Sequence, residues 1–294
     1  MKIELKNHIE LNELLDHKAL GKMVCRSIGH DGCVYFLYRS EIYRAVKLSV
    51  DWTNGLITDQ SIYELGVFDT YLHFVQPIGD DILLVGACSE FNEECAEPNA
   101  VIVGKDGEIK SRFCLGDGIE CCFVTSDEHI VVAYFDEGIF GNNGWGEVDS
   151  PAPLGSAGLV VWDKNGCKLW EHDQSKFFVS HCKSLNISDD GKIYWLGDEG
   201  AEYHLCAYDG SAFSNIGSVR GYSGDFLILE NGFVFGGDHT HRSYFSYRNR
   251  SGECQRFTFE YDGKEIISEK YCFRGNKALL IDMYGRMFCT AVNI

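Results

Sequence analysis

Two histidines separated by one residue, His239 and His241, are the pair in this sequence whose spacing most suggests metal chemistry. In an extended segment, residues at i and i+2 point to the same side, so two imidazoles joined by a carboxylate could hold zinc. A solvated loop, or contact with a partner or substrate through Arg242 and Tyr244, accounts for the same residues. We therefore predict no bound metal and no cofactor.

Nucleophilic and phosphate-binding motifs are absent from the sequence. No Gly-x-Ser-x-Gly elbow and no P-loop occurs, and Gly116-Asp117-Gly118 opens no helix, so it is predicted to be a turn. The 13 cysteines are odd in number and include no Cys-x-x-Cys pair. They are predicted to be buried free thiols in a reducing compartment, with a zinc knuckle or a catalytic cysteine as the alternatives.

Composition excludes several classes of protein. The 294 residues include 32 glycines and only 4 prolines, with 45% hydrophobic and 24% charged residues, as in an ordinary globular protein. No apolar run is long enough to cross a membrane, and the first residues alternate charged with hydrophobic side chains, unlike a signal peptide. The sequence thus predicts a cytoplasmic protein that binds no membrane.

The formal net charge of -18 disfavours a nucleic-acid ligand, since phosphate binding depends on clusters of Lys and Arg. Such a charge suits a basic partner. It also serves simply to keep a cytosolic protein soluble, and neither interpretation bears on the fold.

The elements that must position these residues are hairpins. An apolar run, a polar turn containing Asp, Asn or Gly, and a second apolar run recur along the chain, which is typical of buried β-hairpins. The six copies are Val24 to Leu37, Phe74 to Val85, Cys122 to Ala133, Leu185 to Leu196, Phe226 to Phe235 and Leu279 to Cys289.

More polar hairpins lie between these copies. The first, Ala45 to Ile57, is weakly marked, and the others are Val101 to Ile109, Leu159 to Cys167, His204 to Gly210 and Phe257 to Ile266. Four strands per unit predict an all-β fold, a single β-propeller of six four-stranded blades, although five or seven blades also fit. Helical periodicity is confined to Leu11 to Leu20.

The sixth copy ends the sequence without an outer hairpin after it. We therefore predict that an N-terminal closing segment, residues 1–22, completes the ring. Within it, Lys2 to Leu14 supplies one or two outer strands to the last blade, which removes the exposed sheet edges.

Hydrophobic strands that end in Asp-x-x-Gly or Asp-Gly, as in Val161 to Gly166 and Ala207 to Gly210, resemble blades of the NHL, PQQ-type and gluconolactonase-like propellers. The resemblance implies an architecture and no particular family. Gluconolactonase-like propellers hold a divalent cation at the channel entrance and use it for hydrolysis. The residues expected at the channel mouth here depart from that oxygen-rich set by including two lysines: His73, Glu120, Lys183, Asp225 and Lys277.

Two insertions are the predicted binding loops, because propellers carry function on loops at one end of the ring. The first spans residues 136–158 and offers a tryptophan that we expect to be exposed. Its candidate partner-binding residues are Asp136, Glu137, Phe140, Asn142, Asn143, Trp145, Glu147 and Asp149. The second spans residues 238–252, a local basic patch with candidates His239, His241, Arg242, Tyr244 and Arg248.

Taken together, these features predict a non-catalytic propeller that binds a protein partner, such as an inhibitor or immunity-type protein that masks a basic toxin or nuclease. The alternative is a hydrolase or lyase that acts in the central channel, with or without a divalent metal. Convergence of titratable groups in a pocket would favour the second hypothesis.

Overall fold

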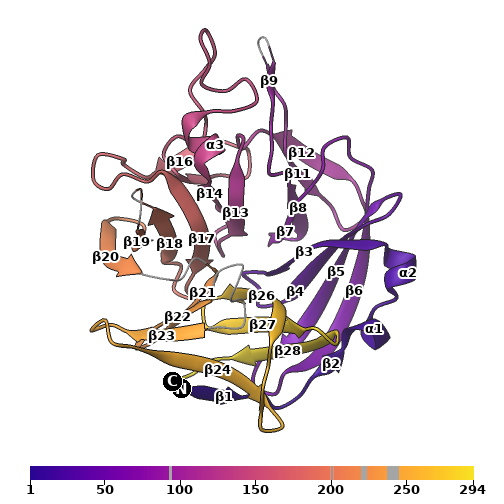
Figure 1. The fold of residues 1–294 in the computed structure, drawn as a ribbon. Coiled ribbons are helices and arrows are strands. Elements are labelled where there is room, and N and C mark those ends of the chain that lie inside the picture. Colours follow the sequence, from indigo (N-terminus) through magenta and orange to yellow (C-terminus); the bar gives the residue numbers. More distant parts are fainter. Residues whose placement is uncertain (93–94, 199, 201, 220–223, 237–244) are drawn as a thin grey trace.

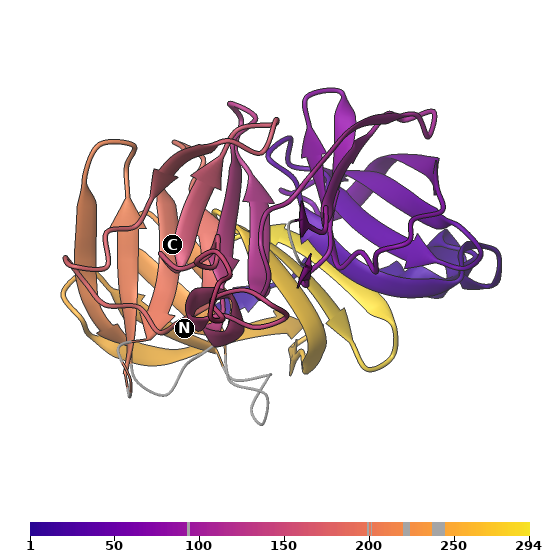
Figure 2. The ribbon, with the colours of Figure 1, turned by 90° about the horizontal axis from the view of Figure 1, so that it is seen from above.

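A ring of six β-sheets surrounds a central axis in the computed structural model, which describes residues 1–294 apart from 93–94, 199, 201, 220–223 and 237–244. Figure 1 looks onto the ring, with the inner strands nearest its centre, and Figure 2 shows it from above. The prediction of an all-β, six-bladed propeller is confirmed.

Each of the first three blades is an antiparallel meander of four strands whose first strand lines the axis. A short hairpin, β9 (Phe91–Asn92) and β10 (Cys95–Ala96), extends from the second blade. The blades consist of β3 (Lys22–Ile28), β4 (Val34–Arg39), β5 (Tyr43–Asp51) and β6 (Leu56–Gly66); β7 (Phe74–Ile78), β8 (Asp81–Val85), β11 (Ala100–Val103) and β12 (Ile109–Phe113); β13 (Ile119–Val124), β14 (Ile130–Tyr134), β15 (Leu159–Trp162) and β16 (Lys168–Glu171).

The last three blades follow the same order, and the fifth and sixth blades also receive strands from the N-terminus. They consist of β17 (His181–Ile187), β18 (Ile193–Asp198), β19 (Tyr203–Tyr208) and β20 (Phe213–Val219); β21 (Phe226–Leu229), β22 (Gly232–Gly236), β23 (Phe245–Asn249) and β24 (Cys254–Tyr261), with β25 (Lys264–Glu265) and β1 (Lys2–Glu4) paired to β24; and β26 (Ser268–Arg274), β27 (Lys277–Asp282), β28 (Arg286–Ala291) and β2 (Ile9–Glu10).

The N-terminal segment contributes to two blades. Strand β2 pairs antiparallel with β28, with Ile9 opposite Met287, and so forms the fourth strand of the sixth blade. Strand β1 instead runs parallel to β24 of the fifth blade, with Ile3 opposite Phe259. The last blade thus receives one strand from the N-terminus, and its neighbour receives the other.

Two hairpins differ from the sequence expectation. Leu279 to Cys289 forms β27 and β28, the second and third strands of its blade, while the inner hairpin is β26 and β27. In the fifth blade, Phe257 to Ile266 covers β24 and β25, and the outer pair is β23 and β24. The local sequence predicts a hairpin but does not show which strands of the blade form it. Packing between blades therefore decides which strand lies innermost.

The core lies between adjacent blades. Successive residues of a strand point to opposite faces of its sheet, and both faces of each second strand are covered by a neighbouring blade. Phe36 packs with Leu279 of the sixth blade, whereas the next residue, Leu37, packs with Leu84 of the second blade. Because both faces are buried, the second strand of each blade has a sequence that is a continuous apolar run.

Three short helices occur among the described residues. The region predicted to be helical contains α1 (Leu11–Leu14) and α2 (His17–Leu20), and Asp16 caps α2 by accepting hydrogen bonds from the backbone of Lys18 and Ala19. Their leucines fill the gap between the first and sixth blades. The third helix, α3 (Asp136–Phe140), lies in the first predicted insertion.

Candidate functional site

The channel has two distinct ends. We call the end at which the inner strands begin the loop face; residues 67–73, 86–92, 95–99, 114–118, 135–158 and 172–180 belong to it. The opposite end, the turn face, carries the turns of the inner hairpins, residues 29–33, 79–80, 125–129, 188–192, 230–231 and 275–276.

Four of the five residues expected at the channel mouth lie at the loop face, because His73, Glu120, Lys183 and Asp225 precede or begin inner strands. The expectation is wrong for Lys277. This lysine begins β27, which runs antiparallel to the inner strand β26, and its Nζ lies 3.0 Å from Oδ1 of Asp189 at the turn face.

An ion pair joins the third and fourth blades at the loop face. Nζ of Lys183 lies 3.2 Å from Oε1 of Glu120, with 20% and 28% of the two side chains exposed. Burial raises the pKa of the nearby Asp225 carboxyl to about 6, although the positive charge of Arg26 counteracts that shift. A carboxyl whose pKa is raised to about 6 thus lies near the Glu120 side chain, which pairs with Lys183.

His73 makes structural contacts and takes no part in this group of charges. Its Nδ1 accepts a hydrogen bond from the backbone N–H of Ala87 at 2.9 Å, and its ring lies 4.7 Å from that of Tyr71. Burial lowers the pKa of His73, which favours the neutral ring that this bond requires. His73 therefore fixes the position of the chain segment that follows β8.

A cavity of about 180 Å³ occupies the channel below the loop face. Glu120 and Asp225 lie at the end of the cavity nearest the loop face, and Arg26 and Gln76 lie farther along their strands toward the turn face. Gln76 is 2% exposed, and its Oε1 has no hydrogen-bond partner among the described residues. The cavity is lined by Cys25, Arg26, Ser27, Ile28, Phe74, Val75, Gln76, Glu120, Cys121, Cys122, Phe123, Asp225, Cys272 and Phe273.

Arg274 closes the channel toward the turn face. Its Nη2 crosses from the sixth blade to donate to the carbonyl of Val124 in the third blade at 2.7 Å, and its guanidinium lies 5.5 Å from the centre of the Phe123 ring. The side chain is 7% exposed, and burial lowers its pKa to about 10. Beside it, buried Asn186 accepts from the N–H of Gly275 at 2.8 Å and donates to the carbonyl of Phe226.

The first insertion is anchored by the residue that we expected to be its exposed tip. Trp145 is 3% exposed, so that expectation is wrong: its Nε1 donates to the carbonyl of Ser89 at 2.8 Å, and its ring lies 5.2 Å from Phe91. Buried Asp117 accepts hydrogen bonds from Ser89 N–H and from the Asn143 amide, at 2.9 and 3.0 Å. The loops of the second and third blades are therefore locked together.

Other residues of the first insertion do face solvent. Phe140 is 58% exposed and Val148 93%, and exposed Phe178 lies next to Phe140, with 6.5 Å between ring centres. Asn142 is half-buried and bonds to Glu137. The exposed carboxylates of the same loop are Asp136, Glu137, Glu147 and Asp149.

The second insertion is only partly covered by the structure. His239, His241, Arg242 and Tyr244 lie outside the described residues. Phe245 to Asn249 is not a loop but strand β23, in which Arg248 is half-buried and donates to the carbonyl of Ser218. Arg248 therefore joins the fourth and fifth blades.

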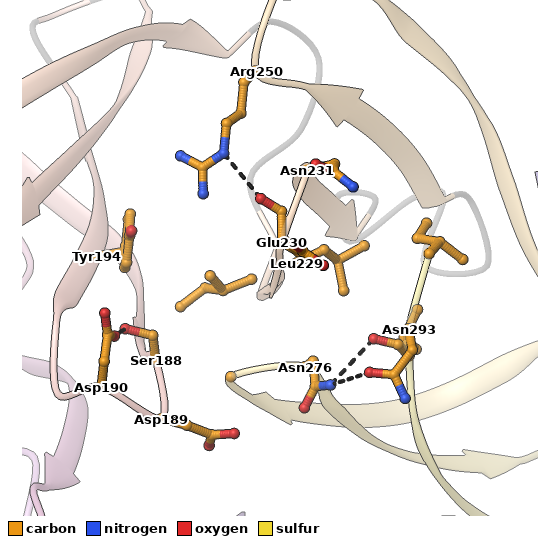
Figure 3. A pocket seen from close by; sticks show the side chains of 14 residues that line it. Ser188, Asp189, Asp190, Tyr194, Leu229, Glu230, Asn231, Arg250, Asn276 and Asn293 are labelled. Atoms are coloured by element: carbon orange, nitrogen blue, oxygen red, sulfur yellow. Dashed lines mark hydrogen bonds between the residues drawn. The ribbon is translucent and has the colours of Figure 1, made fainter.

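A larger, polar pocket of about 570 Å³ opens at the turn face between the last three blades. Figure 3 shows that some of its polar side chains bond to one another or to nearby backbone: Arg250 to the carbonyl of Glu230, Ser188 to Asp190, and Asn276 to Asn293. This pocket has no local signal in the sequence, since its residues come from three inner-hairpin turns, from strands β18 and β21, from Arg250 and from residues 292–294.

None of the 13 cysteines forms a disulfide bond, but they are not all buried. Burial raises the pKa values of the Cys122, Cys182 and Cys289 thiols, which disfavours the nucleophilic thiolate. Exposed thiols occur at Cys88, Cys95, Cys167 and Cys254. Within the described ranges, no group of three or more His, Cys, Asp or Glu side chains could hold a metal ion.

None of the helices in the described part of the chain is long and apolar enough to span a membrane.

Sequence reasoning missed Arg26, Gln76 and Arg274. A usable signal exists for Gln76, because its long polar side chain interrupts an otherwise apolar inner strand, Phe74-Val75-Gln76-Pro77. Polar side chains in that position must face the channel or pair across it.

Comparison with known proteins gives the architecture alone. The chain is similar to selenomethionine-substituted virginiamycin B lyase from Staphylococcus aureus, with a TM-score of 0.53, 11% identity, and coverage of 92% of this chain and 81% of the lyase. It is also similar to the Cps50 (Swd1) β-propeller domain of Myceliophteria thermophila, with a TM-score of 0.50, 8% identity, and coverage of 92% and 83%. No protein-family profile and no curated protein sequence matches the chain.

Proposed function

We propose that this propeller binds a basic protein through the loop face of its second and third blades. The observation that carries the proposal is the combination of exposed Phe140, Val148 and Phe178 with the exposed carboxylates of the first insertion. Apolar anchors surrounded by charge are typical of protein interfaces, in which aromatic residues supply affinity and charges steer association.

The rigidity of the loop supports this role. Trp145 and Asp117 fix the base of the insertion to the neighbouring blade, so its exposed side chains are held in place before a partner arrives. A preorganised surface loses less conformational entropy on binding.

The charge supports a cationic partner. With a net charge of -18, the protein attracts basic proteins at long range, and the effect weakens as salt screens it. A basic toxin or nuclease neutralised by an inhibitor is a partner of this kind. Charge complementarity supports the basic character of the partner and not its identity.

The test compares two variants of equal net charge. The loop variant replaces Asp136, Glu137, Glu147 and Asp149 by the matching amides, and the control replaces four exposed carboxylates of the turn face, Asp80, Asp127, Asp189 and Glu230. A basic protein that co-purifies with the wild type is identified, produced separately and titrated against all three proteins. We expect the loop variant to bind at least about tenfold more weakly and the control to match the wild type. Equal weakening by both variants would contradict the proposal.

A hydrolase or lyase acting in the channel is the second candidate function. The observation that favours it is the pairing of Asp225, whose pKa is raised to about 6, with Glu120 beside the cavity. A carboxyl with a pKa near the working pH can act as general acid or base. Screening esters, lactones and related small substrates with the wild type and Asp225→Asn tests this function, because any true activity must be lost in the variant.

A further inference from the structure

The channel cavity is lined by acidic, basic and apolar side chains, and each kind lies at a different distance from the loop face. The carboxylates of Glu120 and Asp225 lie at the upper end, where the inner strands begin. Arg26 and Gln76 come from the middle of β3 and β7. Ile28, Phe123 and Phe273 lie toward the ends of their strands, just above Arg274.

Two polar groups of the wall lack partners among the described residues. Oε1 of Gln76 is buried without a hydrogen bond, and so is Nε of Arg26, whose Nη2 donates to the carbonyl of Tyr271 at 3.1 Å. A buried polar atom without a partner destabilises the folded protein, and a bound ligand or water can remove that cost by supplying the missing hydrogen bond. Among the described residues no hydrogen bond holds Oε1 of Gln76, so the amide can turn to present either its oxygen or its nitrogen to a ligand.

The charges of the cavity nearly balance. Glu120 and Asp225 contribute two carboxylates, Arg26 contributes a guanidinium, and Lys183 compensates Glu120 from outside the lining. A cation alone would leave Nε of Arg26 without an acceptor, and an anion alone would face both carboxylates. A molecule that carries both charges complements the cavity best.

The volume limits the size of that molecule. About 180 Å³ is below the roughly 300 to 1,000 Å³ of pockets for drug-sized ligands, yet exceeds the cavity of about 150 Å³ that accommodates benzene. It suits one small molecule with a short apolar group and is too small for a folded peptide.

We propose that the channel cavity binds a free α-amino acid with an apolar side chain. Its ammonium group bonds to Glu120 and Asp225, its carboxylate bonds to Arg26, and its side chain lies on the floor formed by Ile28, Phe123 and Phe273. The Gln76 amide contributes a hydrogen bond to either charged group. This inference requires neither a protein partner nor turnover, so it can fail while both candidate functions stand.

The test uses three probes of matched shape: leucine, isoamylamine, which lacks the carboxylate, and 4-methylpentanoate, which lacks the ammonium group. Isothermal titration and thermal shift are measured with the full-length wild-type chain at pH 7.5. We expect leucine to bind with a stoichiometry of one, and each of the other probes to bind at least about tenfold more weakly, since one lost charge contact of about 1.4 kcal/mol corresponds to that factor.

Variants locate the site. Asp225→Asn should weaken leucine and isoamylamine but not 4-methylpentanoate, whereas Arg26→Gln should weaken leucine and 4-methylpentanoate but not isoamylamine. Asp189→Asn, which removes a lysine-paired carboxylate at the turn face, is the matched control and should bind leucine like the wild type. The comparison of the three probes with the wild type stands even if a variant fails to fold.

The pH dependence supplies an independent readout. Asp225 is influenced by Arg26, Glu120 and Lys183, and its charge in turn acts on the thiols of Cys121 and Cys272. Because the Asp225 carboxyl has a pKa of about 6, leucine affinity should fall about tenfold between pH 8 and pH 5 as the carboxylate is protonated. Absence of leucine, valine and phenylalanine binding at about 10 mM, well above ordinary ligand affinities, or equal binding of the three matched probes, would overturn the proposal.

Discussion

Replacing Trp145 by alanine should destabilise the loop face. The indole is 3% exposed, its Nε1 donates to the carbonyl of Ser89, and its ring packs on Phe91. Truncation of a buried tryptophan to alanine costs about 3 to 5 kcal/mol. Because a loop can relax around the gap more easily than a strand, we expect the lower end of that range, about 3 kcal/mol.

In a chain of 294 residues, 1 kcal/mol corresponds to about 2 °C, so Trp145→Ala should lower the melting temperature by about 6 °C. Two controls accompany it. Trp145→Phe keeps a ring but loses the hydrogen bond and should cost about 1 kcal/mol. Phe140→Ala removes a ring that is 58% exposed and should change the free energy of unfolding by less than about 0.5 kcal/mol.

Circular dichroism melts measure the global effect, and limited proteolysis at residues 86–99 and 136–158 measures local opening of the two joined loops. If Trp145→Ala melts within about 1 °C of the wild type and its loops are cleaved no faster, Trp145 does not anchor the insertion. The preorganisation on which the proposed interface depends would then be refuted as well.

Three further predictions concern the closure of the ring, the hydrogen bond between Asn186 and Gly275, and the carboxyl of Asp225. Deletion of residues 1–14 removes β1 and β2 and leaves the edges of β24 and β28 unpaired, so size-exclusion chromatography should show aggregation; a monomer with unchanged melting would contradict this. Asn186→Leu leaves the N–H of Gly275 without its acceptor and should lower stability by about 2 kcal/mol in urea unfolding; a loss below about 0.5 kcal/mol would show that the contact is dispensable. The folded-state pKa of Asp225 is raised to about 6, so its ionised form opposes folding above that pH and the penalty disappears as pH falls; Asp225→Asn should therefore raise the melting temperature at pH 8 and not at pH 4, and an equal effect at both would exclude this carboxyl as the cause.

Strand alternation and turn chemistry are local properties, and they were sufficient to predict most hairpins and the six-bladed ring. Asp163, for example, accepts hydrogen bonds from the backbone of Asn165 and Cys167 within one turn, an interaction set by residues only a few positions apart. The sequence also placed Glu120, Lys183 and Asp225 at one end of the channel, because each precedes or begins an inner strand.

Tertiary structure decided which strands of a blade each hairpin forms and in which direction the long side chains point. Lys277 was assigned to the wrong face because Leu279 to Cys289 has the pattern of an inner hairpin, although β26 occupies the inner position. Trp145 looks like an exposed anchor in a glycine-rich loop, yet a carbonyl 56 residues away and the ring of Phe91 bury it. The bond from Arg274 to Val124 spans 150 residues. Local sequence determines which segments become strands, whereas contacts between distant blades decide what each strand faces, because the free energy of burial is gained only when the ring closes.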